Sequence, residues 1–117
     1  MPRTALTVLT TSRTGLTPAF VAADAVNNHE FPNASQNVVL HVKNGAGAPI
    51  NVTFITPGTV DGQTVGDRIV AVPAGGERII GPFRNTHYGS GTNGSSVYFD
   101  VSSATSITLM ALAVGQA

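Results

Sequence analysis

The side chains of this chain that could do acid–base or metal chemistry are its six acidic residues and three histidines. Two carboxyl groups at a suitable separation form the catalytic pair of a glycosidase, and histidines clustered with carboxylates bind metal ions. Several of the acidic residues, however, lie beside a turn former or a basic residue, as in Asp61-Gly62, Asp67-Arg68 and Glu77-Arg78. Turn, capping and surface ion-pair roles therefore explain these carboxylates better than catalysis does.

The histidines do not form a metal-binding pattern either. His29, His41 and His87 have no His, Asp or Glu two or four residues away, and Glu30 would point to the opposite side of a strand from His29. The chain has no cysteine. No serine sits in a nucleophile elbow, and the glycines of residues 89–94 lack the lysine of a phosphate-binding loop. The sequence therefore predicts no catalytic residue, cofactor or metal, and a protein that is not an enzyme but binds through its surface.

Composition limits the partners. The 117 residues allow a single domain, only 10% of them are charged, and the formal net charge is zero. Nucleic-acid binding needs clustered lysine and arginine, so DNA and RNA are not expected partners. The N-terminal run Thr4-Ala5-Leu6-Thr7-Val8-Leu9 is interrupted by threonine and is too short and too polar for a signal peptide or a membrane span. We therefore expect no membrane partner and synthesis in the cytoplasm.

The elements that must build the binding surface are strands. Val38, Leu40 and Val42 alternate with more polar residues, and the same alternation continues at 50–54 after a turn at 44–49. This pattern predicts a hairpin of two strands. Further turns at Asp61-Gly62 and at 73–76 separate strands around 68–72 and 77–80, and a strand at 97–101 follows.

The closing run of residues 106–114 is apolar throughout, so a helix competes with a strand there. Ile107, Thr108 and Val114 and the all-β context favour a central strand covered on both faces. We predict an all-β fold: a single small sandwich or barrel of about seven to eight mostly antiparallel strands. Residues 21–117 form this domain, and residues 1–20 form either an extended N-terminal arm or an edge strand.

Two polar segments are expected to be loops. Residues 27–35 are rich in turn formers, and Phe31 would anchor that loop against the domain. Residues 84–96 are polar and glycine-rich, which predicts a long exposed loop in which His87 and Tyr88 form an anchor pair for a partner.

Four short segments of the sequence carry a resemblance to a known family. They are His41-Val42-Lys43-Asn44-Gly45, Thr56-Pro57-Gly58-Thr59-Val60-Asp61-Gly62, Val72-Pro73-Ala74-Gly75-Gly76-Glu77-Arg78 and Ile80-Gly81-Pro82-Phe83. Over residues 29–101 the chain resembles small virion proteins of tailed bacteriophages. Some proteins of that kind decorate the assembled head and cement its subunits together. The resemblance implies a structural role in the virion, at the head surface, with the major capsid protein as the partner.

A decoration protein acts through many copies of a modest interface. We expect the N-terminal arm to supply capsid contacts, and the loop after residue 82 to supply an oligomer or ligand interface, in a homo-oligomer such as a trimer. The alternatives are a neck or tail structural protein, or a virion-displayed module whose 84–96 loop recognises carbohydrate or a host surface. The expected contact residues are Arg3, Leu6, Val8, Leu9 and Arg13 in the arm and Phe83, Arg84, His87 and Tyr88 in the interface.

Overall fold

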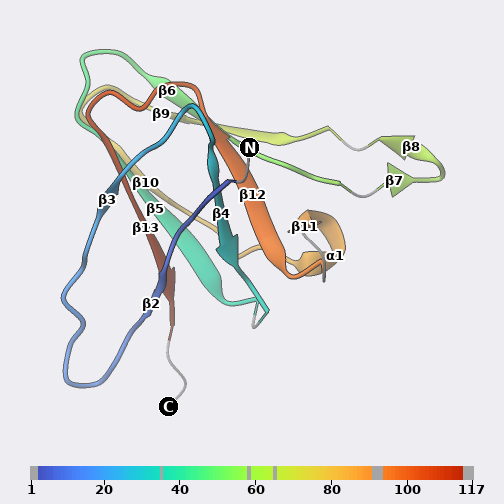
Figure 1. Ribbon diagram of the computed structural model, residues 1–117, viewed down its shortest axis with the longest axis horizontal. Coiled ribbons are helices and arrows are strands. Elements are labelled where there is room, and N and C mark those ends of the chain that lie inside the picture. Colours follow the sequence, from blue (N-terminus) through green and yellow to red (C-terminus); the bar gives the residue numbers. More distant parts are fainter. Residues whose placement is uncertain (1–2, 35, 58, 65, 91–93, 115–117) are drawn as a thin grey trace.

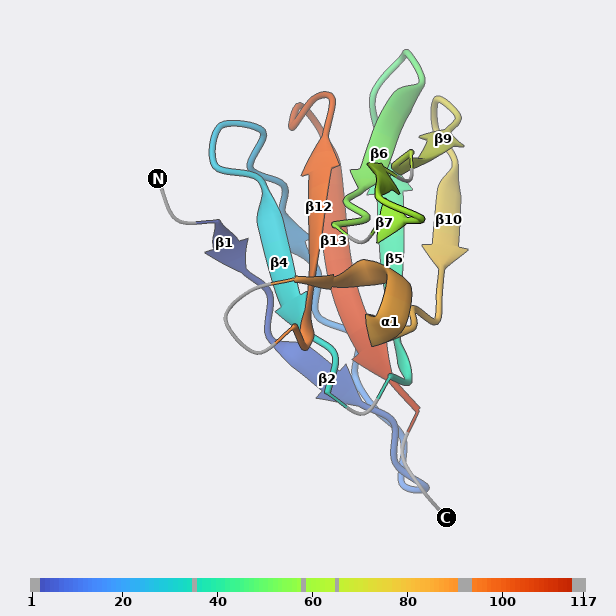
Figure 2. The same ribbon diagram turned by 90° about the vertical axis from the view of Figure 1, so that its right-hand side faces the viewer.

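The computed structural model describes residues 3–34, 36–57, 59–64, 66–90 and 94–114 (Figure 1). In this part of the chain, two β-sheets pack together, and the only helix is the short α1 (Asn85–Tyr88). Seen from the side, β4, β12 and β6 lie in front of β13 and β5 (Figure 2). The prediction of an all-β domain is confirmed, and of the two architectures left open the protein has the sandwich.

One sheet, called sheet A here, has six strands. Its main path runs β1, β4, β12, β6, β9, and β11 also pairs with β12. All of these pairs are antiparallel except β1 with β4. The strands are β1 (Thr4–Ala5), β4 (His29–Pro32), β6 (Ile50–Phe54), β9 (Arg68–Val72), β11 (Gly89–Ser90) and β12 (Ser96–Val101).

The other sheet, sheet B, has five strands in the order β10, β5, β13, β2, with β3 also paired to β13. Only β2 runs parallel to its neighbour. The strands are β2 (Val8–Thr10), β3 (Val21–Ala22), β5 (Val38–Asn44), β10 (Glu77–Ile80) and β13 (Ile107–Ala113).

The mostly antiparallel pairing was predicted, but the number of strands was not. The six and five strands of the two described sheets exceed the seven to eight expected. The difference comes from strands of two or three residues such as β1, β2, β3 and β11, which are too short to show an alternating pattern in the sequence. The central strand predicted at the C-terminus is confirmed as β13, which lies between β5 and β2.

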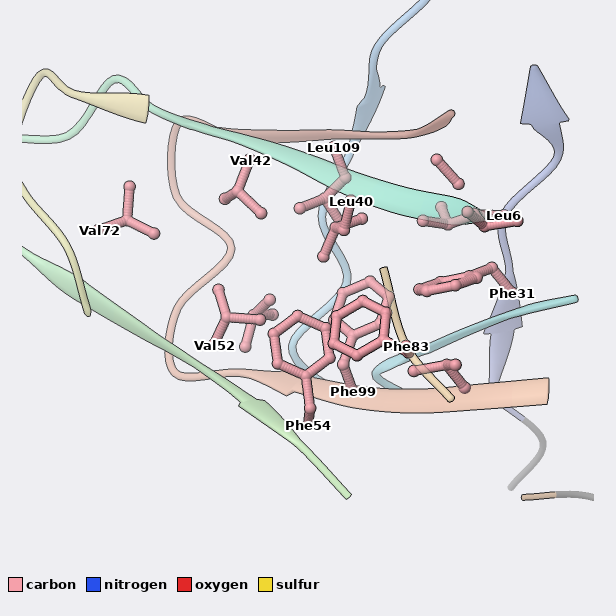
Figure 3. Packing of buried hydrophobic residues seen from close by; sticks show 14 of the residues in the cluster. Leu6, Phe31, Leu40, Val42, Val52, Phe54, Val72, Phe83, Phe99 and Leu109 are labelled. Atoms are coloured by element: carbon pink, nitrogen blue, oxygen red, sulfur yellow. The ribbon is translucent and has the colours of Figure 1, made fainter. Parts of the chain in front are cut away.

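The core forms between the two sheets from alternate side chains of their long strands. Four of the five phenylalanines meet there, with ring centroids 4.6 to 6.1 Å apart, and none is more than 3% exposed (Figure 3). Removing each ring from water contributes about 1.5–3 kcal/mol. The four are Phe31, Phe54, Phe83 and Phe99.

The N-terminal segment belongs to both sheets. Residues 4–5 pair with β4 in sheet A, and residues 8–10 pair with β13 in sheet B. Between them Leu6 enters the core with 5% exposure, and its N–H donates to the carbonyl of Glu30 at 2.8 Å. The segment is therefore a pair of edge strands joined across the side of the sandwich, and the extended arm is the wrong alternative for the described residues 3–12.

The predicted hairpin of residues 38–54 is also wrong. β5 lies in sheet B and β6 in sheet A, so the turn carries the chain from one sheet to the other. The side chain of Asn44 holds this corner: its amide donates to the carbonyls of Ala48 and Val72 at 2.9 and 3.2 Å, and its oxygen accepts from the N–H of Ala46 at 2.9 Å. Alternation correctly identified the buried face of each strand, but it carries no information on which strands pair.

Strand β6 instead pairs with β9, and the chain between them forms the hairpin of β7 (Thr59–Val60) and β8 (Gln63–Thr64). Its turn at Asp61-Gly62 was predicted, and both residues have positive φ, 54° and 77°. This is the conformation of a two-residue type I′ turn. The hairpin projects beyond the sandwich (Figure 1).

Both expected loops contain regular structure. Residues 29–32 of the first form strand β4, because Phe31 and His29 alternate into the core and are fully buried. Residues 84–96 begin with α1 and β11, and β12 starts at Ser96; residues 91–93 lie outside the described part. Phe31 does anchor its segment, as expected, but from within a sheet.

Candidate functional site

The N-terminal residues expected to touch a capsid point in different directions. Leu6 is in the core, so the prediction of an exposed apolar contact there is wrong. Val8 is half-buried and packs against the core. Leu9 is half-buried and borders an apolar cavity of about 260 Å³ between the N-terminal segment, β3 and β13. Arg13 is exposed in the long connection between β2 and β3.

Arg3 is bound to the outer face of sheet A. Its Nη1 donates to Oδ1 of Asp100 at 2.6 Å and to the carbonyls of Phe99 and His29 at 3.1 and 3.2 Å. The guanidinium carbon lies 4.7 Å from the centroid of the Tyr98 ring, within reach of a cation–π interaction. Arg3 therefore closes the edge of its own domain, and a capsid carboxylate would have to displace Asp100.

A buried histidine ties the N-terminal strand to the turn at residues 24–28. His29 is fully buried on β4 and stacks on Phe99 at 5.2 Å. The N–H of Asp24 donates to Nε2 of His29 at 2.8 Å, so this nitrogen carries no proton, and Nδ1 then donates to the carbonyl of Thr4 at 3.2 Å. The imidazole must be neutral to hold both elements at once.

The surroundings of His29 shift its pKa in opposite directions. Burial lowers the pKa of His29 from 6.5, while the Thr4 carbonyl and the Asp24 carboxylate act to raise it and Arg3 lowers it further. Asp24 itself accepts from the N–H of Asn27 and from the Thr4 hydroxyl, and these bonds lower the pKa of its carboxyl to about 2. Both groups keep the ionisation state that this turn needs at neutral pH.

The four residues expected to form an interface after residue 82 separate into a buried one and three accessible ones. Phe83 is in the core, 4.6 Å from Phe54 between ring centroids, so its assignment to an interface is wrong. Arg84 and His87 are exposed, and Tyr88 is half-buried with its ring edge-on to Phe83 at 5.1 Å. Phe83 thus supports the site from beneath.

His87 and Tyr88 line a groove of about 430 Å³, with mixed polar and apolar walls, at the end of the sandwich where β9 begins. Its position is fixed by α1, whose N–H groups at His87 and Tyr88 donate to the carbonyl of Arg84 at 3.0 and 2.9 Å. Arg84 itself lies outside this groove. The other lining residues are Thr56, Gly66, Asp67, Arg68 and Ile69.

Two side-chain contacts order the groove. Nε of Arg68 donates to the hydroxyl of Tyr88 at 3.1 Å. Across from it, Oδ1 of Asp67 accepts from the N–H and the hydroxyl of Thr56 at 2.9 and 3.2 Å. The hydroxyl of Thr56 is also within 3.1 Å of the carbonyl of Gly66.

Sequence reasoning found only half of this groove. It identified His87 and Tyr88, because an aromatic pair stood in a polar segment. It took Asp67 and Arg68 for a local surface pair, whereas the described ion pairs are Arg3 with Asp100 and His41 with Glu77. No local signal brings residue 68 to residue 88, because their contact depends on the pairing of β9 at the edge of sheet A.

Strand β9 (Arg68–Val72) is an edge strand of sheet A and β10 (Glu77–Ile80) is an edge strand of sheet B; the chain joins them directly, and we call the two together the β9–β10 edge. The N–H of Asn44 donates to the carbonyl of Gly76. Because successive residues of an antiparallel strand direct their N–H and C=O groups to opposite sides, the backbone groups of Glu77 and Ile79 point away from β5. On β6, the backbone groups of Asn51 and Ile55 bond to β12, so the residues between them alternate toward β9. The backbone N–H and C=O groups of Ile69 and Ala71, which lie opposite Thr53 and Asn51, therefore point away from β6. The side chains of Ile69 and Ile79 are 63% and 66% exposed.

Within the described ranges, no group of three or more His, Cys, Asp or Glu side chains gathers as a metal site. No helix in the described part of the chain is long and apolar enough to cross a membrane. The groove and the β9–β10 edge are two accessible features of the described part of the chain.

Comparison of the chain with models of protein families, with curated proteins and with solved structures gives no match.

Proposed function

We propose that this protein is a structural virion protein of a tailed bacteriophage, a decoration protein that binds the outside of the assembled head. In this proposal it stabilises the head by bridging subunits of the major capsid protein, and it associates with itself, as a trimer at a three-fold position of the shell. It is made in the host cytoplasm and ends on the head surface. The proposal starts from the sequence resemblance over residues 29–101 and from the single all-β domain.

The observation that carries the proposal is the β9–β10 edge. Soluble monomers cover or blunt free edges, because unpaired backbone groups and exposed apolar side chains lead to association. Here each sheet has an edge strand that exposes an isoleucine, Ile69 on β9 and Ile79 on β10. A strand of a capsid subunit or of a second copy could extend either sheet there by β-augmentation. Charged side chains on these edge strands hinder non-specific pairing with other sheet edges in the free protein; they belong to Arg68, Glu77 and Arg78.

This edge replaces the N-terminal segment as the expected contact surface. Leu6 is buried in the core, Val8 packs against it, and Arg3 is bound to Asp100. Of the five N-terminal residues, only Arg13 is exposed, whereas Arg3, Val8 and Leu9 are half-buried.

Co-sedimentation with capsids of the parent phage that lack this protein tests the proposal, with bound copies counted by quantitative mass spectrometry. Decoration predicts saturation on the order of hundreds of copies, in proportion to the capsid subunits of the symmetric shell. Ile79→Lys should weaken attachment at least tenfold, because a charge would be buried at the contact. Val26→Lys is the matched control, since Val26 is 81% exposed in a turn away from the edge.

Failure of wild-type protein to bind, or a handful of copies per particle, would reject decoration. Equal losses for the two variants would reject the edge as the contact. A small fixed copy number would instead favour a neck or tail protein.

A second candidate function is a binding module, and the groove at Arg68 and Tyr88 favours it. Sugar-binding sites combine an aromatic ring with planar polar side chains, and Tyr88, Arg68 and Asp67 are such residues. Display of this groove on a virion would suit recognition of carbohydrate or another host-surface ligand.

A further inference from the structure

The groove at the start of β9 contains a guanidinium whose position is set by the fold. Arg68 lies at the first residue of β9, opposite Phe54 of β6. Nε donates to the Tyr88 hydroxyl at 3.1 Å, and the Tyr88 ring rests edge-on against buried Phe83. The orientation of the guanidinium therefore depends on the core through two successive contacts.

Among the described residues, no hydrogen bond or ion pair engages the two terminal amino groups of Arg68. The ion pairs among the described residues are Arg3 with Asp100 and His41 with Glu77, so no described carboxylate lies within 4 Å of this guanidinium. The nearest in sequence, Asp67, has Oδ1 engaged by the N–H and hydroxyl of Thr56. A planar guanidinium with both amino groups free matches the two oxygens of a carboxylate.

The remaining walls favour a compact organic ligand over a bare ion. Ile69 contributes an apolar surface, and His87 places an exposed imidazole on the opposite element, α1. A volume of about 430 Å³ falls in the range of small-molecule sites. Asp67 adds a fixed carboxylate that disfavours a second negative charge on the ligand and can accept from a hydroxyl.

We propose that this groove binds the carboxylate of a small organic acid, with Arg68 gripping the two carboxylate oxygens and Ile69 contacting the carbon skeleton. Tyr88 is a positioning residue, because it holds Nε and leaves the amino groups facing the ligand. The acid can come from an acidic sugar or from a simple monocarboxylic acid. The groove shares Arg68 and Ile69 with the β9–β10 edge, but Ile79 does not line it, so Ile79→Lys tests shell binding without changing a residue of the groove.

Titration of ¹⁵N-labelled full-length protein with D-glucuronate, followed by two-dimensional NMR, tests the proposal. We expect saturable shifts of the amide signals of residues 66–69 and 87–88. D-glucose, the neutral analogue, should shift them at least tenfold less at equal concentration. Propionate, a monocarboxylic acid, separates the sources: binding as tight as that of glucuronate assigns the site to carboxylates in general, and weaker binding assigns it to acidic sugars.

Two variants and a control locate the binding group. Arg68→Gln should weaken glucuronate binding at least tenfold, and Tyr88→Phe, which keeps the ring but loses the hydroxyl, should weaken it several-fold. Arg13→Gln removes an exposed arginine elsewhere and should have no effect. A thermal melt of each variant checks that it is folded. Absence of saturable shifts with both acids, equal binding of glucose, or unchanged binding by Arg68→Gln would overturn the proposal.

Discussion

Replacing Leu6 with alanine distinguishes a built-in N-terminal segment from a free arm. The side chain is 5% exposed between β1 and β2, among residues that close the side of the core. The change removes three carbon atoms, and at ~0.8 kcal/mol each their transfer to water costs about 2.4 kcal/mol. Leu6 already borders the cavity of about 260 Å³, so the new space adjoins existing open space and adds little cavity energy. We therefore expect a loss of about 2–3 kcal/mol, in the lower part of the usual Leu→Ala range.

Urea unfolding followed by circular dichroism measures this loss, which corresponds to a fall in Tm of roughly 10 °C for a domain of this size. The slope of the unfolding free energy against urea should stay unchanged, because the native fold is retained. Val26→Ala is the matched control: it truncates an apolar side chain that is 81% exposed, and surface changes usually stay within about 0.5 kcal/mol.

A loss for Leu6→Ala no larger than that of Val26→Ala would refute the reasoning, because it would mean that residue 6 is not packed in the core. Deletion of residues 1–14 extends the test. It would remove β1 and β2 from the edges of both sheets, so we expect loss of cooperative unfolding. If the protein without residues 1–14 stays folded and fails only to attach to capsids, the N-terminal segment is an arm and not part of the folded domain.

Three further changes test polar groups that the fold buries or fixes. His29 has a lowered pKa, so its neutral form stabilises the fold above about pH 6.5 and this contribution is lost as the pH falls towards its folded pKa; His29→Gln should flatten that part of the stability profile. The pKa of Asp24 is lowered to about 2, so its contribution is present above 3.8 and is lost between there and pH 2, and Asp24→Asn should remove this acid-side slope in pH-dependent urea unfolding. A slope that survives either substitution would assign it to other groups. Asn44→Ala should cost about 1–3 kcal/mol in urea unfolding, because it leaves buried backbone groups at the β5–β6 corner without partners; an unchanged midpoint would show that water replaces the amide.

Features that depend on neighbouring residues in the sequence were predicted correctly, whereas features that depend on contacts between distant residues were not. Val38, Leu40 and Val42 alternate with polar residues, and each lies on the buried face as expected. The Asp61-Gly62 turn is equally local, because positive φ at both positions is a property of those two residues. Strand pairing is not local, and the expected hairpin of β5 with β6 became a crossing between sheets.

The candidate site shows the same division. Tyr88 stood out in the sequence as an aromatic side chain in a polar segment, and it lines the groove. Phe83 had the same local setting but lies in the core, and Arg68 had no signal at all. The contact between Arg68 and Tyr88 arises because β9 is an edge strand and α1 packs at its beginning.

The sequence by itself determined the all-β class, the buried face of each long strand and the positions of the tight turns, because alternation of side chains and backbone preferences are set within a few residues. Only the tertiary structure decided that the N-terminal segment joins both sheets, that His29 is buried, and that Arg68 meets Tyr88. These depend on which strands become neighbours. The packing of the whole core determines which strands become neighbours, because Leu6 and the four buried phenylalanines must all be packed closely at the same time.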